Sequence, residues 1–186
     1  MLTVEKVITP EDSIAKNLKD KIENHGAKIG VIGLGYVGLP LAVEKAKVGF
    51  SVIGFDINPA RVDRVNAGDN YIGDVKDEDL KEIVRKELLR AATDFSLLSE
   101  CDVVIICVPT PLTITRDPDI SYIQASTEEI AKYLRPGQFI TLESTTYPGT
   151  TEQVILPLLE KTGLKVGRDF FLAFSPERVD PGNKRF

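Results

Sequence analysis

Five short apolar segments recur along the chain from residue 28 onwards, separated by longer amphipathic stretches. The apolar segments cover residues 28–33, 51–56, 103–108, 139–144 and 170–174. Runs as continuously apolar as these are typical of strands covered on both faces, as in parallel sheets. The amphipathic stretches have apolar residues at helical spacing over 39–48, 61–66, 77–89, 120–134 and 150–159, where Pro157 is expected to end or kink the last one. This alternation predicts an α/β fold with a doubly wound parallel sheet.

A separate helix is predicted before this alternating region. Residues 9–12 read Thr-Pro-Glu-Asp, which gives an N-cap hydroxyl, proline at the first helical position and acids in the first turn. Apolar residues then recur every four positions, at Ile14, Leu18 and Ile22. The sequence therefore predicts a helical extension over residues 1–27 and a single domain over residues 28–186. We expect the apolar stripe to pack against the outside of the domain, with a partner or subunit contact as the alternative.

Composition and charge narrow the class of protein. The chain has 186 residues, 42% hydrophobic and 27% charged, which is typical of a globular domain with a real core. The net charge is -5 and no basic run stands out, which argues against binding to nucleic acid or anionic membranes. No apolar stretch approaches the roughly 20 residues that span a bilayer, and the first residues show no signal-peptide core. We therefore expect a cytoplasmic protein.

The cysteines and the single histidine give no sign of a metal site, so no metal is predicted. Cys101 and Cys107 do not form a Cys-x-x-Cys pair, and Cys107 lies inside an apolar segment. Both are expected to be structural side chains, because free cysteine behaves as a small hydrophobe. His25 lies in a polar stretch beside a glycine and is expected on the surface without a role.

The first apolar segment runs directly into a glycine-rich turn, Gly33-Leu34-Gly35-Tyr36-Val37-Gly38. This Gly-x-Gly-x-x-Gly pattern is weak alone, but here it follows a strand and opens a helix, and Asp56 closes the next strand. Gly33 permits the tight turn, Gly35 lets the backbone approach a pyrophosphate, and Gly38 lets the helix pack closely on the sheet. The unpaired N–H groups at the helix start favour an anion. Together these features predict a Rossmann-type dinucleotide-binding domain.

Asp56 determines which dinucleotide is expected. An acid at this place accepts hydrogen bonds from the adenosine ribose hydroxyls and repels a 2′-phosphate, so NAD is favoured over NADP. Arg61 follows five residues later and is expected against the adenine or a phosphate. If Arg61 turned toward the ribose it could tolerate NADP, so binding of NADP stays open.

Further segments carry a resemblance to a known family. They are GLGYVGLPLA at 33–42, CVPTPL at 107–112, LESTTYPGTTE at 142–152 and FSPERVDPGN at 174–183. In this order they resemble the UDP-glucose/GDP-mannose dehydrogenase family, and the resemblance covers about residues 28–186. Because ligands of open α/β sheets lie at the carboxyl ends of strands, these segments are expected to line one crevice.

The resemblance implies roles for individual residues. Contacts to NAD would come from Tyr36, Val37, Asp56, Arg61, Val108, Pro109, Thr110 and Thr145. Thr145 also resembles the family's threonine that helps to hold a catalytic water. Glu177 matches the glutamate of the family's Pro-Glu signature, which serves in acid–base work and thioester hydrolysis.

The reaction that the resemblance implies is a four-electron oxidation of a sugar C6 alcohol to a carboxylate, with two hydrides passing to NAD. The resemblance also implies a cysteine thiolate that captures the intermediate aldehyde. The residues that follow Glu177, Arg178-Val179-Asp180, resemble the branch that acts on UDP-N-acetylglucosamine or UDP-N-acetylmannosamine, and we favour the former. The UDP-glucose branch typically continues Pro-Glu-Phe-Leu, so UDP-glucose or GDP-mannose is the alternative substrate.

The match is incomplete in one respect. Family members continue with a connecting helix, through which they usually form homodimers, and a second domain that carries the catalytic cysteine. Cys101 and Cys107 do not lie in the right place for that role, so we expect this chain to bind NAD without turnover.

Two different functions are also compatible with the sequence. A β-hydroxyacid dehydrogenase also opens with Gly-Leu-Gly, but it usually continues with a methionine-rich helix, whereas this chain has Met1 alone. A non-catalytic NAD-binding module would need no catalytic cysteine. Both functions stay open at this point.

Overall fold

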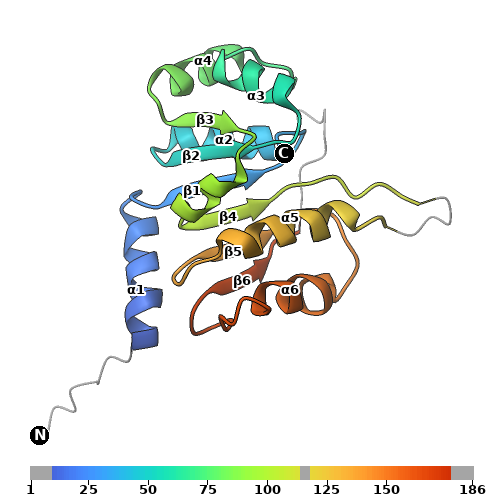
Figure 1. Ribbon diagram of the computed structural model, residues 1–186. Coiled ribbons are helices and arrows are strands. Elements are labelled where there is room, and N and C mark those ends of the chain that lie inside the picture. Colours follow the sequence, from blue (N-terminus) through green and yellow to red (C-terminus); the bar gives the residue numbers. More distant parts are fainter. Residues whose placement is uncertain (1–9, 114–117, 177–186) are drawn as a thin grey trace, which may run out of the picture.

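The computed structural model describes residues 10–113 and 118–176, and within them six parallel strands form one sheet (Figure 1). The strands are β1 (Lys28–Ile32), β2 (Ser51–Phe55), β3 (Leu89–Ala92), β4 (Val103–Ile106), β5 (Phe139–Leu142) and β6 (Phe171–Phe174). Their order across the sheet is β3-β2-β1-β4-β5-β6, so the chain winds outward from β1 in both directions. The predicted doubly wound Rossmann fold is thereby confirmed. The order in which strands are added to the sheet reverses between β1 and β4, while all strands stay parallel.

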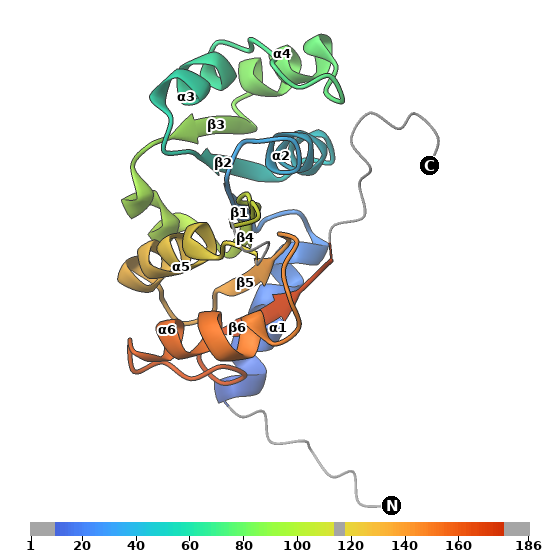
Figure 2. The same cartoon turned by 90° about the vertical axis from the view of Figure 1, so that its right-hand side faces the viewer.

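Helices cover both faces of this sheet, and each face has its own buried core. The first face carries α2 (Gly38–Lys47), α3 (Pro59–Asn66) and α4 (Asp77–Arg85). The second carries the 3-10 helix η1 (Phe95–Glu100), α5 (Ser121–Tyr133), the π-helical turn η2 (Thr151–Ile155) and α6 (Leu156–Glu160). Figure 2 shows α2 and α5 on opposite sides of the sheet. Two covered faces explain why β1 and β4 read as continuous apolar runs.

Strand β3 is not predicted by the hydrophobic pattern, which predicts a helix over 77–89 instead. The helix α4 ends at Arg85, and Glu87 adopts a left-handed conformation with φ of 59°. The N–H of Leu88 then donates to the carbonyl of Ile83, which closes the helix end. Residues 89–92 pair with β2 at the edge of the sheet. A strand of four residues that directly follows a helix leaves no periodicity of its own, so only the pairing with β2 defines it.

The expected helix over 150–159 is divided, as Pro157 suggested. Thr151–Ile155 forms the π-helical turn η2, and α6 begins at Leu156 with Pro157 in its first turn. Proline has no N–H to donate to the preceding turn, but in the first turn of a new helix that N–H is not needed. The proline therefore marks a change of helical winding, and the helical path continues to Glu160.

The N-terminal helix α1 (Pro10–Glu23) is docked on the domain, as the apolar stripe predicted. Leu18 is buried in the first core and Ile22 packs against it. Figure 1 shows α1 crossing the side of the sheet where the strands begin. The expected N-cap at Thr9 lies outside the described residues. His25 follows the helix with φ of 59°, and its exposed side chain contacts the ring of Phe50.

No helix in the described part of the chain is long and apolar enough to cross a membrane.

Candidate cofactor-binding site

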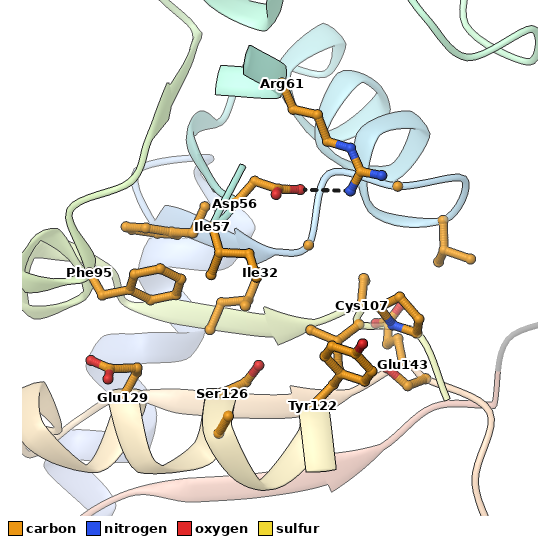
Figure 3. Close-up of a pocket in the computed structure, with 18 of the residues that line it drawn as sticks. Ile32, Asp56, Ile57, Arg61, Phe95, Cys107, Tyr122, Ser126, Glu129 and Glu143 are labelled. Carbon is orange, nitrogen blue, oxygen red and sulfur yellow. Dashed lines mark hydrogen bonds and ion pairs between the residues drawn. The ribbon is translucent and has the colours of Figure 1, made fainter. Parts of the chain in front are cut away.

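A cavity of about 1060 Å³ opens at the carboxyl ends of the strands, around the reversal point between β1 and β4. Its walls come from the β1–α2 turn, the end of β2, the ends of β4 and β5, and one face of α5. Open α/β sheets bind their ligands at this position, because neighbouring loops there turn to opposite faces and leave a crevice. Figure 3 shows the Asp56–Arg61 pair on one side of the cavity and Ser126 and Glu129 of α5 on the other.

The glycine-rich turn has two positions that no larger residue can occupy. Gly33 has φ of +93°, and a Cβ there would lie 2.5 Å from the carbonyl oxygen of Cys107. A Cβ on Gly38 would overlap the carbonyl oxygen of Gly33. The backbone of the turn therefore folds tightly onto itself and onto the end of β4, and α2 starts close against the sheet.

Gly35 differs from these two glycines. A Cβ at this position would meet no atom within 4 Å, and Gly35 lines the cavity. The packing of the chain does not require glycine here, but a Cβ would project into the space that the turn leaves open. An anion that approaches the N–H groups of the turn needs that space, so the residues present fit the pyrophosphate of a dinucleotide.

Asp56 accepts three hydrogen bonds at the edge of the cavity. It is 5% exposed, and its carboxylate accepts hydrogen bonds from the N–H of Leu34 at 3.0 Å and the N–H of Asn58 at 2.9 Å. The half-exposed guanidinium of Arg61 donates to the same carboxylate at 3.3 Å. A carboxylate offers about four acceptor sites, so about one is left for a ribose hydroxyl. With Arg61 paired to Asp56, the arrangement favours the unphosphorylated ribose of NAD.

The ends of β4 and β5 supply the opposite rim of the cavity. Val108, Pro109, Thr110 and Thr145 all line it, and the hydroxyl of Thr110 donates to the carbonyl of Thr145 at 2.5 Å. This bond joins the loops that follow the two strands. Thr110 thus has a structural partner in addition to its predicted contact with the cofactor. Glu177, the predicted acid–base residue, lies outside the described residues.

One wall of the cavity is formed by residues that the sequence did not predict for the site. Three of these residues face the cavity from α5: Tyr122, Ser126 and Glu129. The others come directly after the last residue of β3: Thr93, Asp94 and Phe95. The α5 residues lie on one helical face, so a polar stripe at spacings of four and three residues was a usable signal. The residues after β3 gave no signal because the strand itself was not recognised.

Both cysteines are buried, as expected for structural side chains. Burial raises the pKa of the Cys101 thiol to about 12, so the nucleophilic thiolate is scarce near neutral pH. Cys107 reaches the cavity wall but is 6% exposed.

The chain is similar to known proteins over most of its length. The UDP-glucose/GDP-mannose dehydrogenase family, NAD binding domain, matches residues 27–185. A UDP-N-acetyl-D-glucosamine 6-dehydrogenase from Pseudomonas aeruginosa is 42% identical over 158 residues, covering 84% of this chain and 36% of that protein. A UDP-N-acetyl-D-mannosamine dehydrogenase from Pyrococcus horikoshii is 40% identical over 83% of this chain and 37% of its own length.

Solved structures are similar too. The crystal structure of an NDP-N-acetyl-D-galactosaminuronic acid dehydrogenase from Methanosarcina mazei superposes with a TM-score of 0.79 at 36% identity. The match covers 89% of this chain and 38% of that one. The chain thus spans little more than a third of the length of the relatives that it matches.

Proposed function

This chain belongs to the UDP-glucose/GDP-mannose dehydrogenase family, and we propose that the protein containing it oxidises the C6 alcohol of a UDP-N-acetylhexosamine to a carboxylate. NAD is the cofactor of the domain. The observation that carries the proposal is the convergence of the Gly33–Gly38 turn, Asp56 and the ends of β4 and β5 on one cavity. The relatives named above act on three different N-acetylhexosamine derivatives, which supports the substrate class without selecting one sugar.

In this proposal the described residues bind and orient the cofactor. The N–H groups of the turn hold the pyrophosphate, and Asp56 accepts a hydrogen bond from the adenosine ribose while Arg61 lies beside it. When bound, NAD accepts the hydrides that leave the sugar carbon. Thr110 and Thr145 would contact NAD beyond the pyrophosphate, and Thr145 would also hold the water that releases the product. Glu177 would act as the acid–base residue.

The proposal also includes features that belong to the whole protein. The thiolate that captures the aldehyde would lie outside residues 1–186, because burial keeps Cys101 protonated and leaves Cys107 little access to substrate. We infer a homodimeric cytoplasmic enzyme, with residues 28–186 as its cofactor domain and residues 1–27 as an extension. We favour UDP-N-acetylglucosamine because of the residues that follow Glu177.

Two measurements test the proposal. Calorimetric titration of this chain should give NAD a dissociation constant in the micromolar-to-millimolar range, with NADP much weaker. The protein that contains the chain should release two NADH for each UDP-N-acetylhexosamine consumed, whereas residues 1–186 alone should release none.

Three outcomes would contradict it. Turnover of UDP-glucose or GDP-mannose in place of the N-acetyl sugars would refute the substrate class. Full oxidation by residues 1–186 alone would refute the need for a further thiolate. Binding of NAD by the whole protein without oxidation of any nucleotide sugar would identify a non-catalytic NAD-binding module.

A further inference from the structure

Leu34, the second residue of the glycine-rich turn, is held from three directions. Its N–H donates to the carboxylate of Asp56 at 3.0 Å, and its carbonyl accepts from the hydroxyl of Tyr71 at 2.7 Å. Its fully buried side chain packs over Gly54 of β2, where a Cβ would lie 2.6 Å from Leu34 Cδ2. The backbone of Leu34 therefore has little freedom, and one of its three restraints comes from Tyr71, in the loop between α3 and α4.

The restraint from Tyr71 acts on the peptide group between Leu34 and Gly35. A trans peptide is planar, and its C=O and N–H point in opposite directions. A hydrogen bond that fixes the Leu34 carbonyl therefore also fixes the direction of the Gly35 N–H. Within the described part of the chain no acceptor engages this N–H, and Gly35 lines the cavity. The Gly35 N–H is thus an oriented donor at the place where the pyrophosphate is expected.

Tyr71 is itself positioned by its surroundings between α3 and α4. The guanidinium of Arg64 lies over its ring at 5.0 Å from the centroid and donates to the carbonyl of Asn70 at 2.8 Å. The side-chain amide of Asn70 donates to the carbonyls of Ile72 and Val75 and so fixes the loop on the other side. The half-buried Tyr71 does not line the cavity, so its hydroxyl would reach the cofactor only through the turn.

The hydroxyl of Tyr71 also stays a donor over the physiological range. Burial, followed by the nearby negative charge of Asp56, raises the pKa of Tyr71 to about 12. The phenol is therefore protonated near neutral pH and can donate its hydrogen bond to the carbonyl of Leu34.

We propose that Tyr71 is a positioning residue of the NAD site, which directs the Gly35 N–H at the cofactor's pyrophosphate by holding the Leu34 carbonyl. The inference rests on the assignment of the cavity to NAD and goes beyond it, since the residue lies outside the glycine motif and outside the cavity wall. If the inference is correct, loss of the Tyr71 hydroxyl should weaken the binding of ligands that carry a pyrophosphate and leave the binding of adenosine unchanged.

The test compares Tyr71→Phe with the parent chain in calorimetric titrations with NAD, ADP-ribose and adenosine. Loss of one hydrogen bond should weaken NAD and ADP-ribose about three- to tenfold. Adenosine, whose ribose contact at Asp56 is retained, should bind within about twofold of the parent. Amide NMR adds a direct signature, because the shift of the Gly35 amide on addition of NAD should shrink in Tyr71→Phe.

A matched control is Asp69→Ala, which removes the ion pair with Arg64 in the same loop but leaves the Tyr71 hydroxyl in place. It should bind NAD within about twofold of the parent, because an exposed ion pair contributes little.

An equal loss of NAD and adenosine affinity in Tyr71→Phe would overturn the proposal. A loss of NAD affinity in Asp69→Ala as large as that in Tyr71→Phe would overturn it too. So would a Tyr71→Phe chain that binds NAD normally or fails to fold. If the parent chain itself does not bind NAD, the assignment of the cavity fails first, and the parent titration shows this separately.

Discussion

Asp56 has two roles, one in binding the cofactor and one in fixing the glycine-rich turn. Its place at the end of β2, after a glycine-rich turn, predicted an acceptor for the ribose hydroxyls of the cofactor. The structure adds a second role, because the same carboxylate accepts from the N–H groups of Leu34 and Asn58 and so fixes the turn before any ligand arrives. Sequence spacing could not predict these bonds, since they depend on how closely β1 and β2 lie at their ends.

Replacement of Asp56 by Asn should weaken NAD binding by about 1.5–3 kcal/mol, or roughly ten- to 150-fold, because charge-assisted hydrogen bonds are lost. The preference for NAD over NADP should shrink at the same time, since the carboxylate that repels a 2′-phosphate is gone. Calorimetric titration with both cofactors measures the two effects.

The control for this variant is Asp63→Asn, which makes the same chemical change on α3 away from the cavity wall. It should leave both affinities unchanged. Equal NAD affinity in Asp56→Asn and in the parent chain would show that the carboxylate does not contact the cofactor.

At the scale of elements, the sequence predicted five strands and five of the helical segments of the domain, each within a few residues. Those elements carry their own periodicity: a strand between two helical layers is apolar throughout, and a helix on one layer has an apolar face. Strand β3 and the helix η1 lack such a pattern. Strand β3 is defined by its pairing with β2 at the edge of the sheet, and η1 lies in the connection from β3 to β4. Both depend on contacts that only the assembled sheet provides.

Asp102 is the residue that joins the N-terminal helix to the sheet. It precedes β4, it is 7% exposed, and it accepts from Lys21 of α1 at 2.8 Å, from Arg135 at 3.0 Å and from the N–H of Lys28 at 3.0 Å. Burial alone would raise the pKa of this carboxyl, but these three donors outweigh it and hold the pKa below its usual value. These contacts thus tie α1, β1 and the loop before β5 to the start of β4.

Asp102→Asn should therefore destabilise the fold by about 1.5–3 kcal/mol, the range for hydrogen bonds to charged groups. For a chain of this size that corresponds to a fall in Tm of roughly 4–10 °C. Thermal unfolding near neutral pH measures it, with Glu100→Gln as the control. Glu100 forms an exposed ion pair with Lys28 nearby, so its loss should change stability by less than about 1 kcal/mol.

The effect of Asp102 should depend on pH. Its folded pKa is depressed, so its contribution is complete above the unfolded value of about 3.9 and is lost as the pH falls through the lower folded value. The difference in stability between the parent and Asp102→Asn should therefore narrow below about pH 4. A constant difference down to about pH 2 would contradict this account.

At the scale of the whole molecule, binding of NAD should stabilise the fold by mass action. With NAD at about 100 times its dissociation constant, the gain is about 2.7 kcal/mol, which raises Tm by roughly 5–10 °C. NADP at the same concentration should raise it much less. An equal shift with NADP would show that the Asp56–Arg61 pair does not discriminate against the 2′-phosphate.

The sequence by itself determined the class of fold, the cofactor and the family, because each rests on local information. Periodicity follows from burial on one or two faces, and the phosphate turn needs particular residues at fixed offsets, such as Gly33 with its positive φ. Relations between distant segments were decided only by the tertiary structure: the bond from Tyr71 to Leu34, the α5 wall of the cavity, and the attachment of α1 through Asp102. The physical reason is that hydrogen bonds and packing depend on where side chains lie in space. The sequence gives the separation of residues along the chain, but the folded sheet determines which distant residues come into contact.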